Sequence, residues 1–308
     1  MDLEIAKPFT LRCGLTLPNR LIKAAMTEQM ADKNYLPGDI YHTVYKKWAE
    51  GGWGMVITGE HTYSVHNIEY IPDAFAGNVQ IDHTFLGNMR DTAIDPSLEK
   101  ETLETWKSWA AACNVSDSPV IMQINHPGRQ SPLGAGKKGL FTKAIAPSAV
   151  PLKFGDGYIA RFSSALLFGT PLEMTVSDIQ RIVKQFVHAA SMAAKTGFAG
   201  IQIHAAHGYL LTQFLSEDMN TRSDEYGGSP ENRVRIIVDI IKGIREVVPS
   251  SFCVSIKFNS VDHQSETKLQ ECIEQLKLIA DAGIDFLEIS GGSYEDPTVN
   301  RNSGVLYR

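Results

Sequence analysis

The chain of 308 residues has few cysteines, and no two of its four cysteines form a Cys-x-x-Cys pair. Cys13, Cys113, Cys253 and Cys272 lie far apart, in segments with a buried or helical pattern. Scattered cysteines without paired spacing are typical of a reduced protein and not of a disulfide framework or a zinc site. We therefore expect free thiols and no metal.

Long apolar runs and blocks of basic residues are also missing from the sequence. No apolar stretch approaches the ~18 residues that cross a bilayer, and the N-terminal segment lacks the charged and apolar regions of a signal peptide. The net charge is −6, with no run of lysine and arginine. We expect no nucleic-acid partner, no membrane partner and a cytoplasmic location.

The composition, with 43% apolar and 21% charged residues, is that of an ordinary globular protein. Strand patterns alternate with helix patterns along it. Strands are expected at 19–27, 54–60, 119–126, from 201, at 253–259 and at 285–292, and helices at 37–51, 101–114, 175–197, from 230 and at 266–282. This alternation predicts parallel βαβ units in a single α/β domain that covers residues 1–308.

Two long segments interrupt the alternation. Residues 61–100 are rich in His, Asn, Asp and Gly, and we expect much of this segment to form a loop over the carboxyl end of the sheet. Residues 127–174 contain Pro-Gly-Arg and Gly-Ala-Gly-Lys-Lys-Gly and show no clean helical period. Loops of this length are more often lids or binding loops than filler, so we expect a lid-like insertion here.

The stretch from Ile201 to Leu215 places His204, His207 and Tyr209 at the end of the fourth strand. The carboxyl ends of strands carry the chemistry in barrels and open α/β sheets. Two imidazoles supply hydrogen-bond donors and a phenol supplies a proton. A structural pair of histidines and a buried tyrosine anchor are the alternatives that the residues leave open, and no third ligand is spaced for a metal.

Four motifs occur in order along the chain: Asn19-Arg20 with Ala-Ala-Met-Thr27, Gln123-Ile-Asn-His-Pro-Gly-Arg129, the segment His204 to Leu215, and Asn220-Thr-Arg-Ser-Asp-Glu-Tyr-Gly-Gly-Ser-Pro-Glu-Asn-Arg233. Together they resemble the old yellow enzyme family of FMN-dependent ene-reductases. The resemblance implies a (β/α)₈ barrel whose site lies at the carboxyl ends of the strands.

The resemblance also implies a flavin pocket. Its residues are Ala25, Met26 and Thr27 beside the flavin, Gly59 at a close approach, and Gln123, whose amide would bind the flavin pyrimidine.

In the same way, the resemblance implies that His204 and His207 grip the carbonyl oxygen of an activated alkene and that Tyr209 donates the proton. Lys257 stands where the family has a basic residue near the flavin N1 and O2. Arginine is common there, and lysine keeps the charge but loses the planar fork. A solvated charge at a strand end is the alternative interpretation of Lys257.

Glu60 departs from the family pattern as an extra ionisable group at the end of the second strand, although a solvated loop explains it equally well. Arg222, Asp224 and Arg233 are expected to fix their loop and cap the next helix, without touching a substrate.

The number of strands is the main departure from the family. Six can be placed, whereas the family has eight, and loops after strands seven and eight hold the cofactor phosphate. The sequence thus predicts an incomplete TIM-type (β/α) barrel with the last two βα units missing. FMN binding is expected to be weakened or lost. Exposed edges on the first and sixth strands predict a homo-oligomer.

Three functions remain open. We favour a cofactor-independent isomerase or epimerase that moves a proton next to a carbonyl of a small hydrophobic, natural-product-type substrate, because the proton-handling residues are present without the phosphate anchor. The alternative is an FMN- and NAD(P)H-dependent ene-reductase of α,β-unsaturated carbonyl compounds. The third is a degenerate barrel without catalysis.

Overall fold

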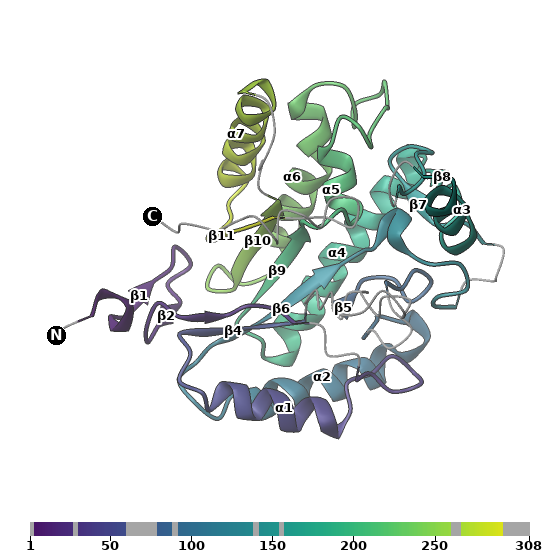
Figure 1. Cartoon of the computed structure of the whole chain (residues 1–308). Coiled ribbons are helices and arrows are strands. Elements are labelled where there is room, and N and C mark those ends of the chain that lie inside the picture. Colours follow the sequence, from purple (N-terminus) through teal and green to yellow (C-terminus); the bar gives the residue numbers. More distant parts are fainter. Residues whose placement is uncertain are drawn as a thin grey trace.

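A curled sheet of parallel strands is the frame of the fold (Figure 1). The computed structural model describes residues 3–26, 30–59, 79–87, 92–137, 142–153, 157–259 and 266–291. The order across the sheet is β11 (Phe286–Ser290), β10 (Cys253–Asn259), β9 (Gly200–Ala205), β6 (Val120–Asn125), β4 (Met55–Thr58) and β3 (Ile22–Lys23). All neighbouring pairs are parallel, so the carboxyl ends of the strands meet at one edge.

These strands confirm the predicted incomplete barrel with six parallel strands. The first is shorter than expected, since β3 covers only part of the segment 19–27. A further strand, β5 (Val79–Gln80), pairs with the end of β6, in a segment expected to be irregular. A strand of two residues is too short to show a period in the sequence.

Helices cover the outer face of the sheet in the same order as the strands (Figure 1). They are α1 (Asp39–Ala49), α2 (Glu99–Cys113), α4 (Val176–Thr196), α6 (Pro230–Val247) and α7 (Glu266–Asp281). Local signals set their ends. Thr175 and Asp178 form the predicted capping box of α4, and the Ser229 hydroxyl accepts the Asn232 amide at the start of α6.

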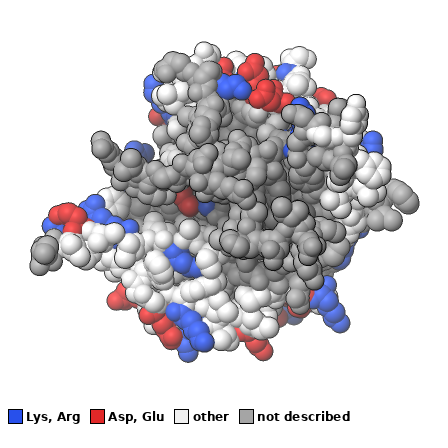
Figure 2. Space-filling model, viewed as in Figure 1, with Lys and Arg blue, Asp and Glu red and all other residues white. Residues whose placement is uncertain are grey.

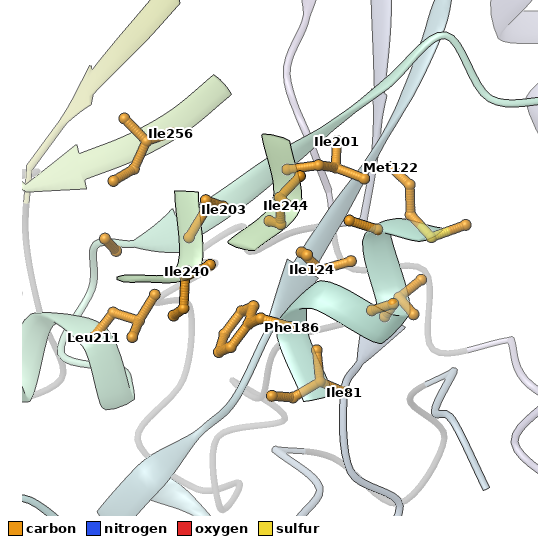
Figure 3. Packing of buried hydrophobic residues seen from close by; sticks show 14 of the residues in the cluster. Ile81, Met122, Ile124, Phe186, Ile201, Ile203, Leu211, Ile240, Ile244 and Ile256 are labelled. Atoms are coloured by element: carbon orange, nitrogen blue, oxygen red, sulfur yellow. The ribbon is translucent and has the colours of Figure 1, made fainter. Parts of the chain in front are cut away.

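The main core lies between the sheet and these helices (Figure 3). Every second residue of the central strands points outward and is apolar, including Met122, Ile124, Ile201, Ile203 and Ile256. They meet Phe186 on α4 together with Ile240 and Ile244 on α6. Because strand side chains alternate between the two faces, the residues between them point into the barrel.

A smaller apolar cluster lies inside the amino-terminal end of the barrel. The hairpin of β1 (Phe9–Thr10) and β2 (Thr16–Leu17) contributes Leu11 and Leu17 to it. These side chains pack against Met55 and Ile57 of β4 and Ile121 of β6. This end of the barrel is apolar, so the polar chemistry is confined to the other end.

The segment 127–174 is more regular than its sequence predicts. It contains η3 (Gly128–Gln130), β7 (Ile145–Ala146), α3 (Tyr158–Leu167) and β8 (Leu172–Glu173). The helix α3 was missed because its N-cap, Gly157, gives no side-chain cap. Tyr158, Phe162 and Leu166, four residues apart on one exposed side, are the signal that could have found it. A lid role for this insertion, and the single domain 1–308, stay predictions.

Three short elements complete the described fold: η1 (Glu4–Ala6), η2 (Pro96–Leu98) and α5 (Leu210–Leu215). Among the described residues, no helix has the length and apolarity that crossing a membrane requires. On the face drawn in Figure 2, described basic and acidic side chains lie close together around the rim. This mixture gives the described part of that face no broad field of one sign.

Gly200 offers a test of the strand packing. A Cβ there would lie 2.3 Å from the Cys253 carbonyl oxygen and 2.6 Å from its Cβ, because β9 and β10 are in close register at this point. Gly200→Ala should lower the free energy of unfolding by about 1–3 kcal/mol, as overpacking does. Urea unfolding followed by circular dichroism measures this.

Gly157→Ala is the matched control, since a Cβ at Gly157 meets nothing within 4 Å. A smaller loss of about 0.5–1 kcal/mol is expected there, roughly the difference between glycine and alanine at an N-cap. Equal unfolding midpoints for the two variants would contradict the packing described here.

Candidate active site

The inner face of the sheet is polar at the carboxyl ends of four neighbouring strands. The residues are Gln123 and Asn125 on β6, Gln202 and His204 on β9, Lys257 and Asn259 on β10, and Glu288 and Ser290 on β11. Gln123 is in register with Gln202, and Lys257 is in register with both His204 and Glu288. Register partners in parallel strands point to the same side, so these groups converge inside the barrel.

His204 is fully buried at the carboxyl end of β9. Its Nδ1 accepts a hydrogen bond from the Ala206 amide at 3.2 Å, so the neutral imidazole carries its hydrogen on Nε2. The ring meets the Tyr209 ring edge-on at 4.8 Å and the His207 ring at 5.1 Å between centroids. The tautomer of His204 is therefore fixed with Nε2–H as a donor, and its ring contacts the rings of His207 and Tyr209.

His207 lies in a strained turn that three other residues hold. Its φ is +59°, in the left-handed region that few side chains other than glycine adopt. The His207 amide donates to Asn259 Oδ1 at 3.2 Å, and its carbonyl accepts from Gln130 Nε2 at 3.0 Å. His207 Nε2 lies 2.8 Å from Ser290 Oγ. The ring is thus oriented from both its backbone and its side chain.

Tyr209 is the N-cap residue of α5 and is buried, with 1% of its surface exposed. Gly208, with a φ of +77°, brings the chain round from His207 to this helix. The first helical amide, that of Leu210, donates to the His126 carbonyl at 3.0 Å. This bond joins the ends of β9 and β6 and fixes the position of the phenol.

The Gln213 side chain joins the loop after β6 to the loop after β9. Its Nε2 donates to the carbonyls of Gly208 at 2.8 Å and Pro127 at 3.2 Å, and its Oε1 accepts the Arg129 amide at 3.2 Å. A Cβ on Gly128 would lie 2.4 Å from this Oε1, and the φ of Gly128 is +59°. Glycine is therefore needed in the Pro-Gly-Arg motif at this close approach.

Lys257 is buried, with 4% exposed surface, and its Nζ lies 3.2 Å from Glu288 Oε1. The alternative interpretation, a solvated charge at the strand end, is therefore wrong. A buried ammonium needs an opposite charge, and Glu288 supplies it from the neighbouring strand.

Gln123 and Asn125 are fully buried and present polar atoms without partners. Gln123 Nε2 donates to Gln202 Oε1 at 2.6 Å. Within the described residues, Gln123 Oε1 and both polar side-chain atoms of Asn125 have no hydrogen-bond partner. Buried polar atoms are usually bonded, so these atoms fit a ligand with a polar edge, such as the pyrimidine end of FMN.

The other predicted flavin-pocket residues differ in burial, and two of them are not described. Ala25 is buried, whereas Met26 is 37% exposed. Gly59 directly follows β4 with a φ of +62°, and its amide donates to Tyr45 OH at 2.8 Å. A positive φ explains why glycine stands there. Thr27 and Glu60 lie outside the described residues.

Five polar residues of this face were missed in the sequence: Asn125, Gln202, Asn259, Glu288 and Ser290. Each lies two positions from another polar residue of the same strand. A polar residue at every second position of an otherwise apolar strand is the signal that could have found them.

Arg222, Asp224 and Arg233 fix their loop, as the sequence predicts. Arg222 donates to the Pro147 carbonyl at 2.8 Å and to Asp224 Oδ1 at 3.0 Å. The hydrogen bond from Arg222 lowers the pKa of Asp224. Arg233 donates to the Leu215 carbonyl at 2.9 Å, which anchors the end of α5.

The fold brings together two cysteines that are far apart in the sequence. Ligand atoms of Cys13, Cys253 and Asp285 lie within 4.8 Å of one another. The Asp285 carboxylate already accepts from Arg245 at 2.7 Å and from the Val254 amide at 2.8 Å. Burial raises the pKa of the Cys253 thiol, which disfavours the thiolate that a metal needs. The absence of a metal site stays a prediction. All four cysteines are free.

Comparison with known proteins identifies the family. The model of the NADH:flavin oxidoreductase / NADH oxidase family matches residues 93–304. The chain belongs to this family. The matched segment includes β6, β9, β10 and β11, and with them His204, His207 and Tyr209.

Relatives within the family are longer than this chain. It is 52% identical to the NADH-dependent flavin oxidoreductase iliE of Neonectria sp. (strain DH2), over 97% of the chain and 37% of the relative. It is 50% identical to the NADH-dependent flavin oxidoreductase iccE of Talaromyces variabilis, over 97% of the chain and 68% of the relative. The old yellow enzyme homologue of Zymomonas mobilis has the same fold, with a TM-score of 0.75 and 22% identity. The match covers 97% of this chain and 78% of that protein.

These findings correct the expected function. Relatives of the family are named NADH-dependent flavin oxidoreductases, which contradicts a cofactor-independent isomerase or epimerase and supports the reductase alternative. The expectation that no cofactor is used is not supported either, since the family and these relatives are named for flavin and NADH. Membership of an oxidoreductase family also favours an enzyme over a non-catalytic barrel.

Gln213→Leu tests how firmly the site is held. The variant leaves the Arg129 amide and two carbonyls without their buried partner. The free energy of unfolding should fall by roughly 2–4 kcal/mol, since each unsatisfied buried group is costly. In hydrogen exchange, the Arg129 amide should lose protection. The control, Gln180→Leu on the exposed side of α4, should change neither measurement.

Full protection of the Arg129 amide in Gln213→Leu would show that Gln213 does not hold the two loops together.

Proposed function

We propose that this chain binds FMN against the polar inner face of the sheet and reduces an activated carbon–carbon double bond with electrons from NADH. The observation that carries the proposal is the convergence of His204, His207 and Tyr209, all buried, with ring centroids 4.8 and 5.1 Å from that of His204. Membership of a flavin oxidoreductase family supports the cofactor.

The two histidines hold the carbonyl oxygen of the substrate. The His204 tautomer directs an Nε2 hydrogen as donor, and His207 is the second imidazole beside it. Hydrogen bonds to this oxygen become stronger as negative charge develops on it during reduction. Two donors in a buried site therefore lower the barrier without moving.

Tyr209 donates the proton that completes the reduction. Its ring is fixed at the start of α5 and packs edge-on against His204, so its hydroxyl acts next to the held carbonyl group. A phenol is a weak acid and stays protonated at neutral pH, as a general acid must.

The chain offers matching groups for the cofactor. FMN, when bound, supplies the hydride. Gln123 and Asn125 present buried polar atoms, and Lys257 presents an ammonium held by Glu288. These three groups lie on the same inner face as His204 and would orient the ring system so that substrate and cofactor meet.

The substrate in this proposal is a small hydrophobic α,β-unsaturated carbonyl compound. The polar groups of the site are used on the carbonyl oxygen and on the cofactor, which leaves apolar contacts for the rest of the molecule. Free cysteines also support a reducing compartment, and we propose the cytoplasm.

A spectrum and a turnover assay test the proposal. Purified protein with FMN should show a bound-flavin absorbance band and should oxidise NADH when 2-cyclohexen-1-one is present. His204→Ala or His207→Ala should lower kcat/KM by about 10²–10³-fold, the usual loss for an oxyanion donor. Tyr209→Phe should lower it by about 10²–10⁴-fold through the lost proton donor.

His188→Ala, on the exposed side of α4, is the control and should keep the wild-type rate. A protein that binds no flavin, or His204→Ala, His207→Ala and Tyr209→Phe variants that are each as active as the wild type, would refute the proposed function.

We also propose a homo-oligomer. Within the described residues, β3 and β11 are the ends of the sheet and pair on one side only. Ile22 and Ile289 on these strands are exposed apolar side chains. Unpaired apolar edges favour association. Light scattering should give a mass of at least two chains, and a monomer at micromolar concentration would be evidence against it.

A further inference from the structure

Three side chains on three different strands form a hydrogen-bonded row inside the barrel, which we call the amide relay: Gln123, Gln202 and Glu288. Gln123 Nε2 lies 2.6 Å from Gln202 Oε1, and Gln202 Nε2 lies 2.9 Å from Glu288 Oε2. Gln202 reaches Glu288 across β10, the strand between them, on which Ser255 is its register partner. The relay is buried at Gln123 and Gln202.

The carboxylate gives the amide relay a direction. An ionised carboxylate has only acceptors, so Gln202 must turn its NH₂ group toward Glu288 and its oxygen toward Gln123. Gln202 Oε1 then accepts a hydrogen bond from the NH₂ group of Gln123. The oxygen and nitrogen of an isolated amide can exchange places, but here the carboxylate decides both orientations.

Lys257 holds the carboxylate in place. Its ammonium lies 3.2 Å from Glu288 Oε1, the oxygen that Gln202 does not use. Both carboxylate oxygens of Glu288 therefore have a partner, which fixes the orientation of the carboxylate. The two residues are in register on β10 and β11, so the ion pair is built into the sheet.

This direction determines which atom of Gln123 remains available to a ligand. With its NH₂ group committed to Gln202, Gln123 presents Oε1, a pure acceptor, and within the described residues this oxygen has no partner. A buried acceptor without a partner selects strongly for a ligand N–H and against a ligand carbonyl.

We propose that Glu288 is a positioning residue that acts through Gln202 to make Gln123 an acceptor, so that the site selects a ring carrying an imide N–H. The inference rests on the proposed function, in which that ring is the pyrimidine end of FMN and the N–H is at N3. It assigns roles to Glu288 and Gln202, neither of which touches the cofactor.

The experiment compares FMN with 3-methyl-FMN, which lacks the N3 hydrogen, by absorbance titration of the full chain. Wild-type protein should bind FMN at least about tenfold more tightly than 3-methyl-FMN, as sites built for a hydrogen bond reject ligands that cannot make it. In Glu288→Gln the new amide turns its oxygen to the Lys257 ammonium, which can only donate, and offers its NH₂ group to Gln202. Both glutamines can then turn over, and this ratio should fall at least threefold.

Gln202→Met is the second variant, since it breaks the amide relay but leaves the Glu288–Lys257 pair. Its ratio should fall as well. Glu271→Gln is the matched control: Glu271 Oε2 also pairs with a buried cation, Arg233 Nη2, at 2.5 Å, but outside the amide relay. Its ratio should equal that of the wild type. Using the ratio removes any general effect of a lost charge on flavin affinity.

Each outcome decides a separate point. Wild-type protein that binds neither compound refutes the proposed function as well as this inference. Wild-type protein that binds both equally refutes the inference alone. A tenfold preference that survives in Glu288→Gln or in Gln202→Met would be steric, and would show that the amide relay does not orient Gln123.

Discussion

The turn from β9 into α5 is the constraint on which the candidate site depends. Two consecutive residues, His207 and Gly208, have positive φ values of +59° and +77°. A histidine in the left-handed region costs of order 1–3 kcal/mol and persists only where neighbours fix it. Asn259 and Gln130 bind its backbone, from the ends of β10 and of the loop after β6. The strain is therefore balanced by contacts that also define the site.

This turn can be held because the sheet has two different faces. The outward side chains of β6, β9 and β10 are apolar and pack on α4 and α6, which supplies most of the buried apolar surface. The inward side chains at the carboxyl ends are then free to be polar. Burying these polar groups is tolerable in part because the amide relay and the Lys257–Glu288 pair join side chains of β6, β9, β10 and β11 to one another.

Much of this arrangement could be predicted from the sequence. The capping box at Thr175, the cap at Ser229 and the apolar periods predicted the helices that cover the sheet. The position of His204 and His207 at a strand end predicted where the candidate site lies. Register could not be predicted, since a sequence does not say which strands are neighbours. Without the register of β10 and β11, the sequence did not show that Glu288 pairs with Lys257, and a solvated Lys257 fitted equally well.

A cofactor such as FMN is held by two separate sets of contacts. In barrels of this kind the loops after strands seven and eight hold the phosphate, whereas the proposed function places the ring system against the polar inner face of the described sheet. In that proposal, the residues on β6, β9 and β10 contact the ring and not the phosphate. Two unpartnered groups among them, Gln123 Oε1 and the Asn125 amide, are fully buried within the described residues. Burying them without a ligand is costly. Polar atoms that a fold buries but does not satisfy are thus better evidence for a cofactor than any segment outside the strands that carry them.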